Sequence, residues 1–223
     1  MTRAARLDHP TRQAQIYETA ARVFCENGYE KASMIDVALA MKMTKAGIYH
    51  HISSKEELLA AIIAYGMEVF ERQVLDRVVT IRDPLERLRA TLRGHLLLVL
   101  RDRPKEVTVI LHESRALPAS ARARVNARKK RYIRFLEKTI RELVMRKIAR
   151  PVDPSVAAFA LLGMVNWTYQ WYRPGGRMSE VALADAMTDF YLNGLLAAPA
   201  RSGARARDAA RTKPGAPGPG RAA

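Results

Sequence analysis

The sequence predicts an all-α protein in which a small N-terminal group of helices precedes a larger helical body. Apolar residues recur at the three- and four-residue spacing of helices, and no convincing run alternates apolar and polar residues as a strand does. Proline and glycine stand where the periodic segments stop. The chain has 223 residues, 48% of them hydrophobic, so it can bury a substantial core.

Three short helices and the start of a long one are predicted in the N-terminal part. They cover about residues 11–27, 33–41 and 44–51, with the long helix beginning at 54–55. Gly28 ends the first helix, Ser33 and Thr44 are placed as N-caps, and a tight turn runs through Lys42 and Met43. Ile16, Ala20, Val23 and Phe24 share one face of the first helix, and the second helix has the apolar residues Ile35, Val37 and Ala38. The long helix carries Leu58, Ile62, Val69 and Val74 inward.

The remaining helices form the body. They are predicted at about residues 84–101, 105–115, 120–149, 153–172 and 179–197. We therefore expect a head over residues 1–55, ordered from about residue 11, and a body over 56–198. Residues 199–223 are rich in Pro, Gly, Arg and Ala, cannot bury a core, and are predicted to form a disordered basic tail.

The chain is strongly basic. Its 38 Lys and Arg residues outweigh 22 Asp and Glu, for a net charge of +16. Such an excess favours an anionic partner, and nucleic acid, a membrane surface and a phosphorylated ligand all qualify.

Several features of the sequence exclude particular classes of protein. Cys25 is the only cysteine, which excludes an intramolecular disulfide and a cysteine-based zinc site, and its apolar surroundings predict a packed core residue. No apolar segment follows the N-terminus as in a secretory signal, so a cytoplasmic protein is expected. No cofactor is expected either. Residues 154–172 are uncharged, but their polar members and marginal length favour a buried helix over a membrane span.

The stretch MTKAGIYHHISSKEELL, residues 43–59, completes a helix-turn-helix pattern. The second helix would lie in a DNA major groove, with a hydroxyl at its start, a glycine that allows close approach, and outward polar side chains. The predicted contacts are Thr44, Lys45, Ala46, Gly47, Tyr49, His50, His51 and Lys55. A metal site is disfavoured because adjacent helical histidines point about 100° apart and no third ligand stands at a suitable spacing.

Residues 12–60 resemble the N-terminal domain of the TetR (tetracycline repressor) family of bacterial transcription regulators. The family's run of Tyr, any residue, His, an aromatic or apolar residue, any residue, Ser and Lys is matched by Tyr49, His51, Ile52, Ser54 and Lys55. The resemblance implies an all-helical homodimer with a DNA-binding head and a ligand-binding body. It also implies DNA contacts by Ser33, Thr44, Lys45, Tyr49, His51 and Lys55.

Two positions depart from the family pattern. The turn has Met41, Lys42, Met43 and Thr44 where Ala-Gly-Val-Ser is common, so Lys42 either takes a positive φ, at a cost of about 1 kcal/mol, or the turn differs. Ile52 replaces the usual phenylalanine. Both changes affect the operator sequence more than DNA binding itself.

The last two predicted helices resemble the family's dimerisation pair, although their apolar faces could also serve the monomer core alone. The predicted dimer residues are Phe159, Leu162, Met164, Val165, Met187, Phe190, Tyr191 and Leu195.

The stretch GMVNWTYQWYRPGGRMS, residues 163–179, is similar to a motif of regulators that respond to acyl-CoA thioesters. Its aromatic residues Trp167, Trp171 and Tyr172 could line a ligand pocket, and a role as core and dimer anchors explains them equally well. Between Arg122 and Arg150, twelve basic residues face two glutamates. Coenzyme A phosphates would account for this charge, and a solvated basic face would account for it equally well.

An acyl chain would need an apolar cavity between the body helices. Its predicted lining is Met67, Phe70, Leu92, His95, Leu96, Val109, His112, Phe135 and Trp167, with Glu113 and Arg115 as further polar anchors. For each residue singly, core packing is the more frequent explanation.

The function that these patterns favour is a ligand-responsive repressor, released from a palindromic operator by a small-molecule effector. No nucleotide loop, nucleophile elbow or metal cluster indicates an enzyme. The alternative is a basic membrane-surface or acyl-CoA-binding helical protein without sequence-specific DNA binding.

Overall fold

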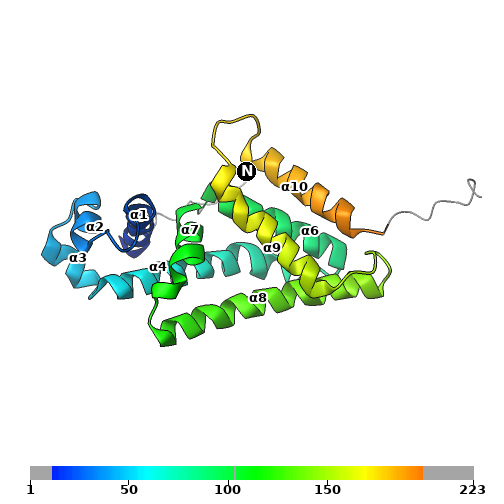
Figure 1. Ribbon diagram of the computed structural model, residues 1–223, viewed down its shortest axis with the longest axis horizontal. Coiled ribbons are helices and arrows are strands. Elements are labelled where there is room, and N and C mark those ends of the chain that lie inside the picture. Colours follow the sequence, from blue (N-terminus) through cyan, green and yellow to red (C-terminus); the bar gives the residue numbers. More distant parts are fainter. Residues whose placement is uncertain (1–11, 103, 198–223) are drawn as a thin grey trace, which may run out of the picture.

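Helices account for nearly all of the regular structure in the computed structural model, which describes residues 12–102 and 104–197 (Figure 1). The predicted tail at 199–223 lies outside the described residues. In this part of the chain the only strand-like contact is a bridge between Ala149 and Leu196. The elements are α1 (Arg12–Asn27), α2 (Met34–Ala40), α3 (Lys45–His51), α4 (Lys55–Phe70), η1 (Glu71–Leu75), α5 (Asp76–Val78), α6 (Pro84–Leu97), η2 (Leu98–Asp102), α7 (Pro104–His112), η3 (Glu113–Ala116), α8 (Ala119–Met145), α9 (Pro154–Trp171) and α10 (Glu180–Leu195).

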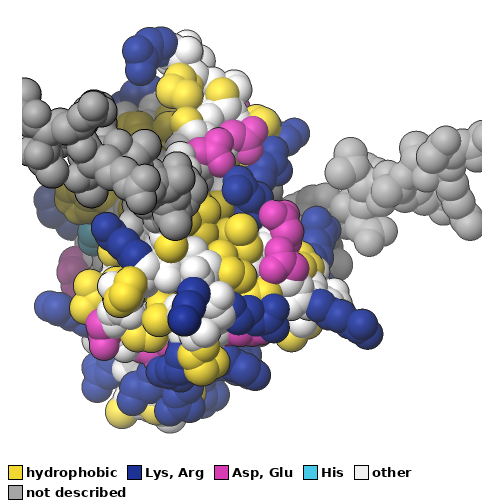
Figure 2. Space-filling model, turned by 90° about the vertical axis from the view of Figure 1, so that its right-hand side faces the viewer, with side chains coloured by type: hydrophobic (Ala, Val, Ile, Leu, Met, Phe, Trp, Pro, Cys, Tyr) yellow, Lys and Arg dark blue, Asp and Glu magenta, His cyan; other side chains and the backbone are white. Residues whose placement is uncertain are grey.

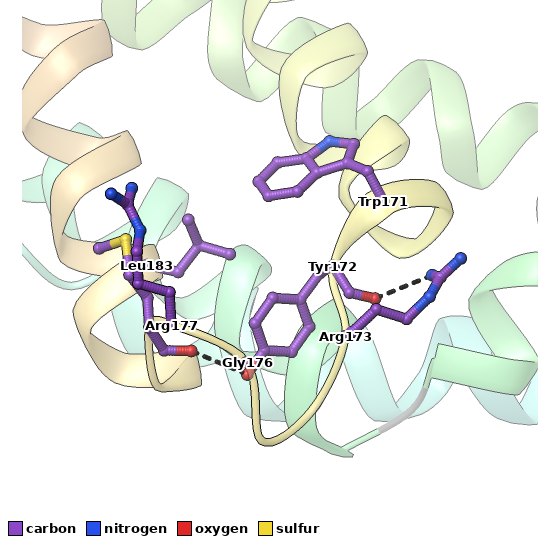
Figure 3. A pocket seen from close by; sticks show the side chains of 7 residues that line it. Trp171, Tyr172, Arg173, Gly176, Arg177 and Leu183 are labelled. Atoms are coloured by element: carbon purple, nitrogen blue, oxygen red, sulfur yellow. Dashed lines mark hydrogen bonds between the residues drawn. The ribbon is translucent and has the colours of Figure 1, made fainter.

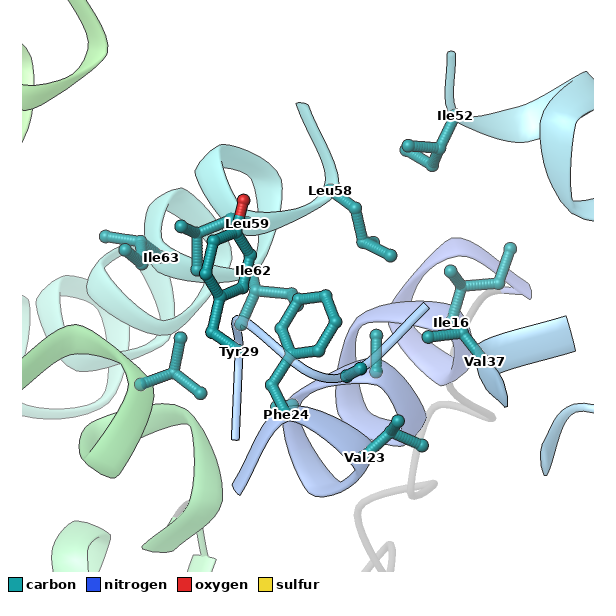
Figure 4. Packing of buried hydrophobic residues seen from close by; sticks show 14 of the residues in the cluster. Ile16, Val23, Phe24, Tyr29, Val37, Ile52, Leu58, Leu59, Ile62 and Ile63 are labelled. Carbon is teal, nitrogen blue, oxygen red and sulfur yellow. The ribbon is translucent and has the colours of Figure 1, made fainter. Parts of the chain in front are cut away.

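The helices α1, α2 and α3 form the head, at one end of the elongated molecule, and α4 leads from it into the body (Figure 1). The head core packs Ile16, Phe24 and Val37 together with Leu58 and Ile62 of α4, all buried (Figure 4). Ile48 of α3 belongs to the same cluster. The same apolar cluster includes Val109 of α7 and Leu117, Ala121 and Val125 around the start of α8. The head core therefore continues into the body without a break.

Local side chains fix most helix ends. Ser33, Thr44 and Ser54 each accept a hydrogen bond from a backbone N–H of the first turn, at α2, α3 and α4 respectively. Asp83 and Asp153 do the same at α6 and α9, where proline follows at the first helical position.

The turn between α2 and α3 contains a lysine in a left-handed conformation. Lys42 has a φ of +54°, and the N–H of Met43 donates to the carbonyl of Ala38 at 2.8 Å. This is a Schellman motif, in which the residue after the helix usually is glycine. The expected positive φ at Lys42 is confirmed, and the strain that it stores is of order 1 kcal/mol.

The body core lies among α6, α8, α9 and α10. Leu92, Leu136, Ile140, Leu161 and Val165 are fully buried within it. Among the described helices, none combines the length and the apolarity needed to cross a membrane. The uncharged helix α9 instead packs along α8.

Three predicted helices end differently from expectation. The long helix from residue 54 changes at Glu71 into a π-helical turn, η1, and α6 ends in a second π-helical turn, η2. Such wide turns leave no mark on apolar periodicity. Helix α8 stops at Met145, because Lys147 takes a φ of +57° and closes another Schellman motif with Ile148.

Candidate nucleic-acid interface

Helix α3 is held by one buried side and presents the other to solvent. Ile48 is completely buried in the head core. Lys45, Ala46, Tyr49, His50 and His51 are exposed. A seven-residue helix anchored by a single isoleucine thus places most of the predicted contact residues on one accessible surface.

Thr44 and Gly47 form a close-packed start to this helix. The Gly47 N–H donates to Thr44 Oγ1 at 3.0 Å, and a Cβ on Gly47 would lie 3.2 Å from the same oxygen. Glycine is therefore favoured at this position by local space. The hydroxyl hydrogen of Thr44 stays free to donate, because the oxygen acts as the acceptor toward Gly47.

Ser33 has a structural role at the start of α2. Its Oγ accepts from the Asp36 N–H at 3.2 Å, and Asp36 Oδ2 accepts from the Ser33 N–H at 2.7 Å and from its hydroxyl at 2.8 Å. The Ser33 N–H holds the pKa of Asp36 below its usual value. This capping box fixes the start of α2.

Lys55 also contacts its own chain. Its Nζ donates to the Glu30 carbonyl oxygen at 3.2 Å and lies 4.3 Å from the centre of the Tyr29 ring. Burial raises the pKa of Tyr29 to about 12. The predicted DNA contact of Lys55 thus coexists with a role in fixing the loop between α1 and α2, which sequence reasoning missed because the partners stand 25 residues away.

The paired histidines face each other edge to face, with ring centres 5.7 Å apart. Within the described ranges, no group of three or more His, Cys, Asp or Glu side chains is arranged to hold a metal ion. Cys25 is half-buried against the head core, and its thiol donates to the Lys105 carbonyl oxygen at 3.3 Å.

The predicted ligand residues divide among three places. Phe70 and His95 meet in the body interior, where Leu92 and Leu96 are buried and Phe135 is half-buried. Met67 and Val109 belong to the head core, and His112 is hydrogen-bonded to the Tyr169 hydroxyl at the surface between α7 and α9.

Trp167 is a correction to the predicted cavity. Its side chain is 62% exposed on the outer face of α9, so it lines no interior space in this chain. Helix α9 is apolar nearly all round, and its periodicity did not distinguish the inner from the outer face.

Tyr132 of α8, which was not among the residues predicted to line the cavity, completes an aromatic cluster with Phe70 and His95. The ring centres lie 4.7–5.5 Å apart, and His95 Nδ1 is 3.1 Å from the Tyr132 hydroxyl oxygen. Burial lowers the pKa of His95 to about 4 and raises the pKa of Tyr132. At neutral pH this is an uncharged polar pair inside the body.

This pair should make stability depend on pH. His95 in the unfolded chain takes up a proton near pH 6.5, whereas the folded chain takes it up only near pH 4. The unfolded state therefore binds more protons between these values. The free energy of unfolding should decrease as the pH is lowered through this range, by at most about 1.4 kcal/mol per unit. Urea denaturation between pH 7.5 and 5 should show a flatter dependence for His95→Gln than for the wild type, and equal slopes would contradict this assignment.

The outer faces of α9 and α10 carry an exposed apolar surface, which we call the α9–α10 face. It consists of Val156, Phe159, Trp167, Trp171 and Phe190. Phe190 is 78% exposed. On α9, Gly163 lies between Phe159 and Trp167 in the sequence, and a Cβ at this position would meet no other atom within 4 Å. Figure 2 shows apolar side chains gathered at the end of the molecule where α9 begins, with Lys and Arg side chains around them.

The predicted dimer residues are only partly on this face. Phe159 and Phe190 belong to it. Val165 and Leu195 are buried in the body core, and these two predictions are wrong for a surface of the folded chain. Leu162, Met164, Met187 and Tyr191 are half-buried against the same core.

A pocket of about 250 Å³ opens at the loop between α9 and α10 (Figure 3). Its lining is Trp171, Tyr172, Arg173, Gly176, Arg177, Met178 and Leu183. The Tyr172 ring projects between the two helix ends, and its hydroxyl donates to the Met178 carbonyl oxygen at 3.4 Å. Two arginines thus lie beside the aromatic lining, and Arg173 donates from Nη1 to the Gln170 and Tyr172 carbonyl oxygens.

Part of the charge on α8 is paired. Arg128 and Arg131 bind Glu71, Arg146 binds Glu142, and Lys129 donates to the Ile110 carbonyl oxygen. Four other cations point outward at helical spacing and are exposed: Lys130, Arg134, Lys138 and Arg141.

Comparisons with known proteins agree with this geometry. Residues 16–62 match the family described as "Bacterial regulatory proteins, tetR family", and residues 81–195 match "Tetracyclin repressor-like, C-terminal domain". The crystal structure of AibR in complex with isovaleryl coenzyme A and operator DNA is 50% identical, covers 80% of this chain and 96% of its own, and superposes with a TM-score of 0.75.

More distant relatives are regulators as well. The HTH-type transcriptional regulator HbdR of Aromatoleum sp. (strain CIB) is 24% identical over 72% of this chain and 68% of its own. The repressor KstR2 of Mycobacterium tuberculosis is 21% identical over 83% and 93%. A structure of KstR2 has a TM-score of 0.79 at 20% identity, which supports the fold alone.

Proposed function

Because the chain belongs to the tetR family of bacterial regulatory proteins, we propose that it is a homodimeric repressor of a palindromic operator that a small-molecule effector releases. It is a helix-turn-helix transcriptional regulator, and regulators of this family bind DNA as dimers. The dimer would present two copies of α3 to successive major grooves, roughly 34–36 Å apart.

The exposed side of α3 carries this proposal. Lys45, Tyr49, His50 and His51 project from it. At its start the Thr44 hydroxyl accepts from the Gly47 N–H and keeps its own hydrogen to donate. Such a surface suits phosphate contacts by Lys45 and Thr44 and base-edge contacts by the longer side chains.

The effector that we propose is an acyl-CoA thioester. AibR, half identical to this chain, was crystallised with isovaleryl coenzyme A. Three features of this chain suit such a ligand. Phe70, His95 and Tyr132 offer an apolar interior with one polar point for the acyl end. The pocket beside Arg173 and Arg177, and the exposed cations of α8, offer positive charge for phosphates.

The two monomers would meet through the α9–α10 face. Its exposed aromatic side chains need burial, and it lies on the helix pair that the family resemblance assigns to dimerisation. The proposal requires no catalytic step and places the protein in the cytoplasm. A membrane-surface role is not favoured, because residues 16–62 match the DNA-binding domain of the tetR family.

The test begins with fragments of the source genome retained by the purified protein. We expect a few dyad sites, bound with an affinity that falls steeply as salt rises. Isovaleryl-CoA should then weaken binding to those sites by roughly 5- to 150-fold, the usual range of allosteric coupling. Uniform retention of all fragments would refute sequence-specific repression. If operator binding is specific but is changed neither by isovaleryl-CoA nor by other acyl-CoA thioesters of short and long chain, only the proposed effector class is refuted.

A further inference from the structure

Helix α4 is the structural link between the head and the interior of the body. Leu58, Leu59 and Ile62 lie in the head core. At the other end, Phe70 contacts His95 and Tyr132 in the body. Helix α4 is therefore one route, beside α7 and the start of α8, by which a change in the body can reach the head.

The body end of α4 has unusual backbone geometry. Directly after Phe70, the five residues Glu71–Leu75 form the π-helical turn η1, and the Asp76 N–H donates to the Glu71 carbonyl. Single π-helical turns are often found at functional positions. Conversion of such a turn to α-helix would change the register of the helix by one residue.

Arg128 and Arg131 of α8 both bind the carboxylate of Glu71, the first residue of this turn, and we call this arrangement the Glu71 clamp. Arg128 donates from Nε at 3.0 Å and from Nη2 at 2.7 Å to the two carboxylate oxygens of Glu71. Arg131 donates from Nη2 at 2.5 Å. Arg128 also donates from Nη1 to the Ala64 carbonyl oxygen at 3.3 Å, so it ties α8 to α4 at two points.

The clamp is more than a surface ion pair. The side chains of Glu71 and Arg128 are 22% and 26% exposed, and their contact is bidentate. Partial burial weakens solvent screening, and a bidentate pair fixes direction as well as distance. The three hydrogen bonds hold the pKa of Glu71 below its ordinary value, so the carboxylate is charged at neutral pH.

We propose that the Glu71 clamp is the joint that couples the body to the position of the DNA-binding head. It sits at the π-helical turn of the helix that carries the head, next to the aromatic cluster in the body. As a regulatory element, it rests on the proposed function. With the clamp closed, α4 has a fixed orientation on α8; without it, the head should sample a wider range of positions.

The chain offers a matched control for this inference. Glu68, one turn earlier on α4, pairs with Arg72 of the same segment at 3.7 Å and is well exposed. Glu68→Gln removes the same charge as Glu71→Gln but breaks no contact between α4 and α8. The two variants therefore differ mainly in the clamp.

The experiment uses the full chain with spin labels at Lys31→Cys, an exposed head position, in a Cys25→Ser background. Distances between the two heads of the dimer are measured by electron–electron double resonance, together with operator affinity with and without isovaleryl-CoA. We expect Glu71→Gln to broaden the distance distribution, weaken operator binding roughly tenfold, and reduce the effector response toward none. Glu68→Gln should match the wild type within about twofold, as an exposed pair on one helix contributes little.

Arg131→Gln provides a second variant in case Glu71→Gln folds poorly, because Arg131 is 65% exposed and the Arg128 bond remains. It should give a partial broadening. Distance distributions unchanged in both variants would overturn the inference, whatever the operator data show. If the wild type ignores isovaleryl-CoA, the proposed effector fails, and the distance distributions still decide the role of the clamp.

Discussion

Replacing Phe159 and Trp167 together by aspartate is expected to convert the dimer into folded monomers. Both side chains are more than half exposed in the single chain, so their loss should cost the monomer little. In a twofold interface each substitution acts twice, and four carboxylates would be brought into an apolar surface. We expect the dimer dissociation constant to rise by more than about 100-fold, measured by analytical ultracentrifugation.

A matched variant distinguishes the α9–α10 face from exposed apolar residues in general. Val79 and Met145 are 63% and 70% exposed but lie outside that face. Val79→Asp with Met145→Asp should leave the dimer intact. Operator binding should fall only in the Phe159 and Trp167 variant, because a monomer loses the second half-site. Equal dissociation constants for the two double variants would place the dimer interface elsewhere.

The helix ends could be predicted from sequence because their causes are local. A serine, threonine or aspartate caps a backbone N–H two or three residues away, and the predicted caps at Ser33 and Thr44 are confirmed. At Lys42 the sequence left two alternatives, a positive φ or a different turn, and the structure has the positive φ.

The faces of α9 could not be predicted in the same way. Val165 and Trp167 are two positions apart on an apolar helix, yet one is fully buried and the other is mostly exposed. Apolar periodicity separates inside from outside only when the outside is polar, and an interface removes that contrast. The dimer set therefore mixed core residues with surface residues.

Contacts between distant segments were also beyond the sequence. Glu71 and Arg128 are 57 residues apart, and His95 and Tyr132 are 37 apart. Each pair depends on how α4 and α6 lie on α8, which local patterns do not specify. The twelve basic residues between Arg122 and Arg150 were noted as one charged group, whereas the fold divides them into residues paired within the chain and exposed cations.

Replacing Tyr49 by alanine should weaken operator binding without changing the stability of the head. Its ring is 42% exposed on α3, while Ile48 beside it supplies the packing that holds the helix. We expect an affinity loss of roughly 10- to 100-fold, the usual effect of one good base or phosphate contact. Operator titrations and thermal unfolding of the same samples test both parts of this expectation.

Lys55→Ala is the informative comparison, because its ammonium group has partners within the protein. Loss of the Tyr29 ring contact and of the hydrogen bond to the Glu30 carbonyl should lower the free energy of unfolding by about 1 kcal/mol. If Lys55 also binds a phosphate, the salt dependence of operator binding should become shallower by about one unit per contact. A Lys55→Ala variant that loses stability but keeps the wild-type salt slope would show that this lysine positions the head and does not touch DNA. A Tyr49→Ala variant that binds the operator normally would remove the tyrosine from the interface and leave recognition to Lys45 and the two histidines.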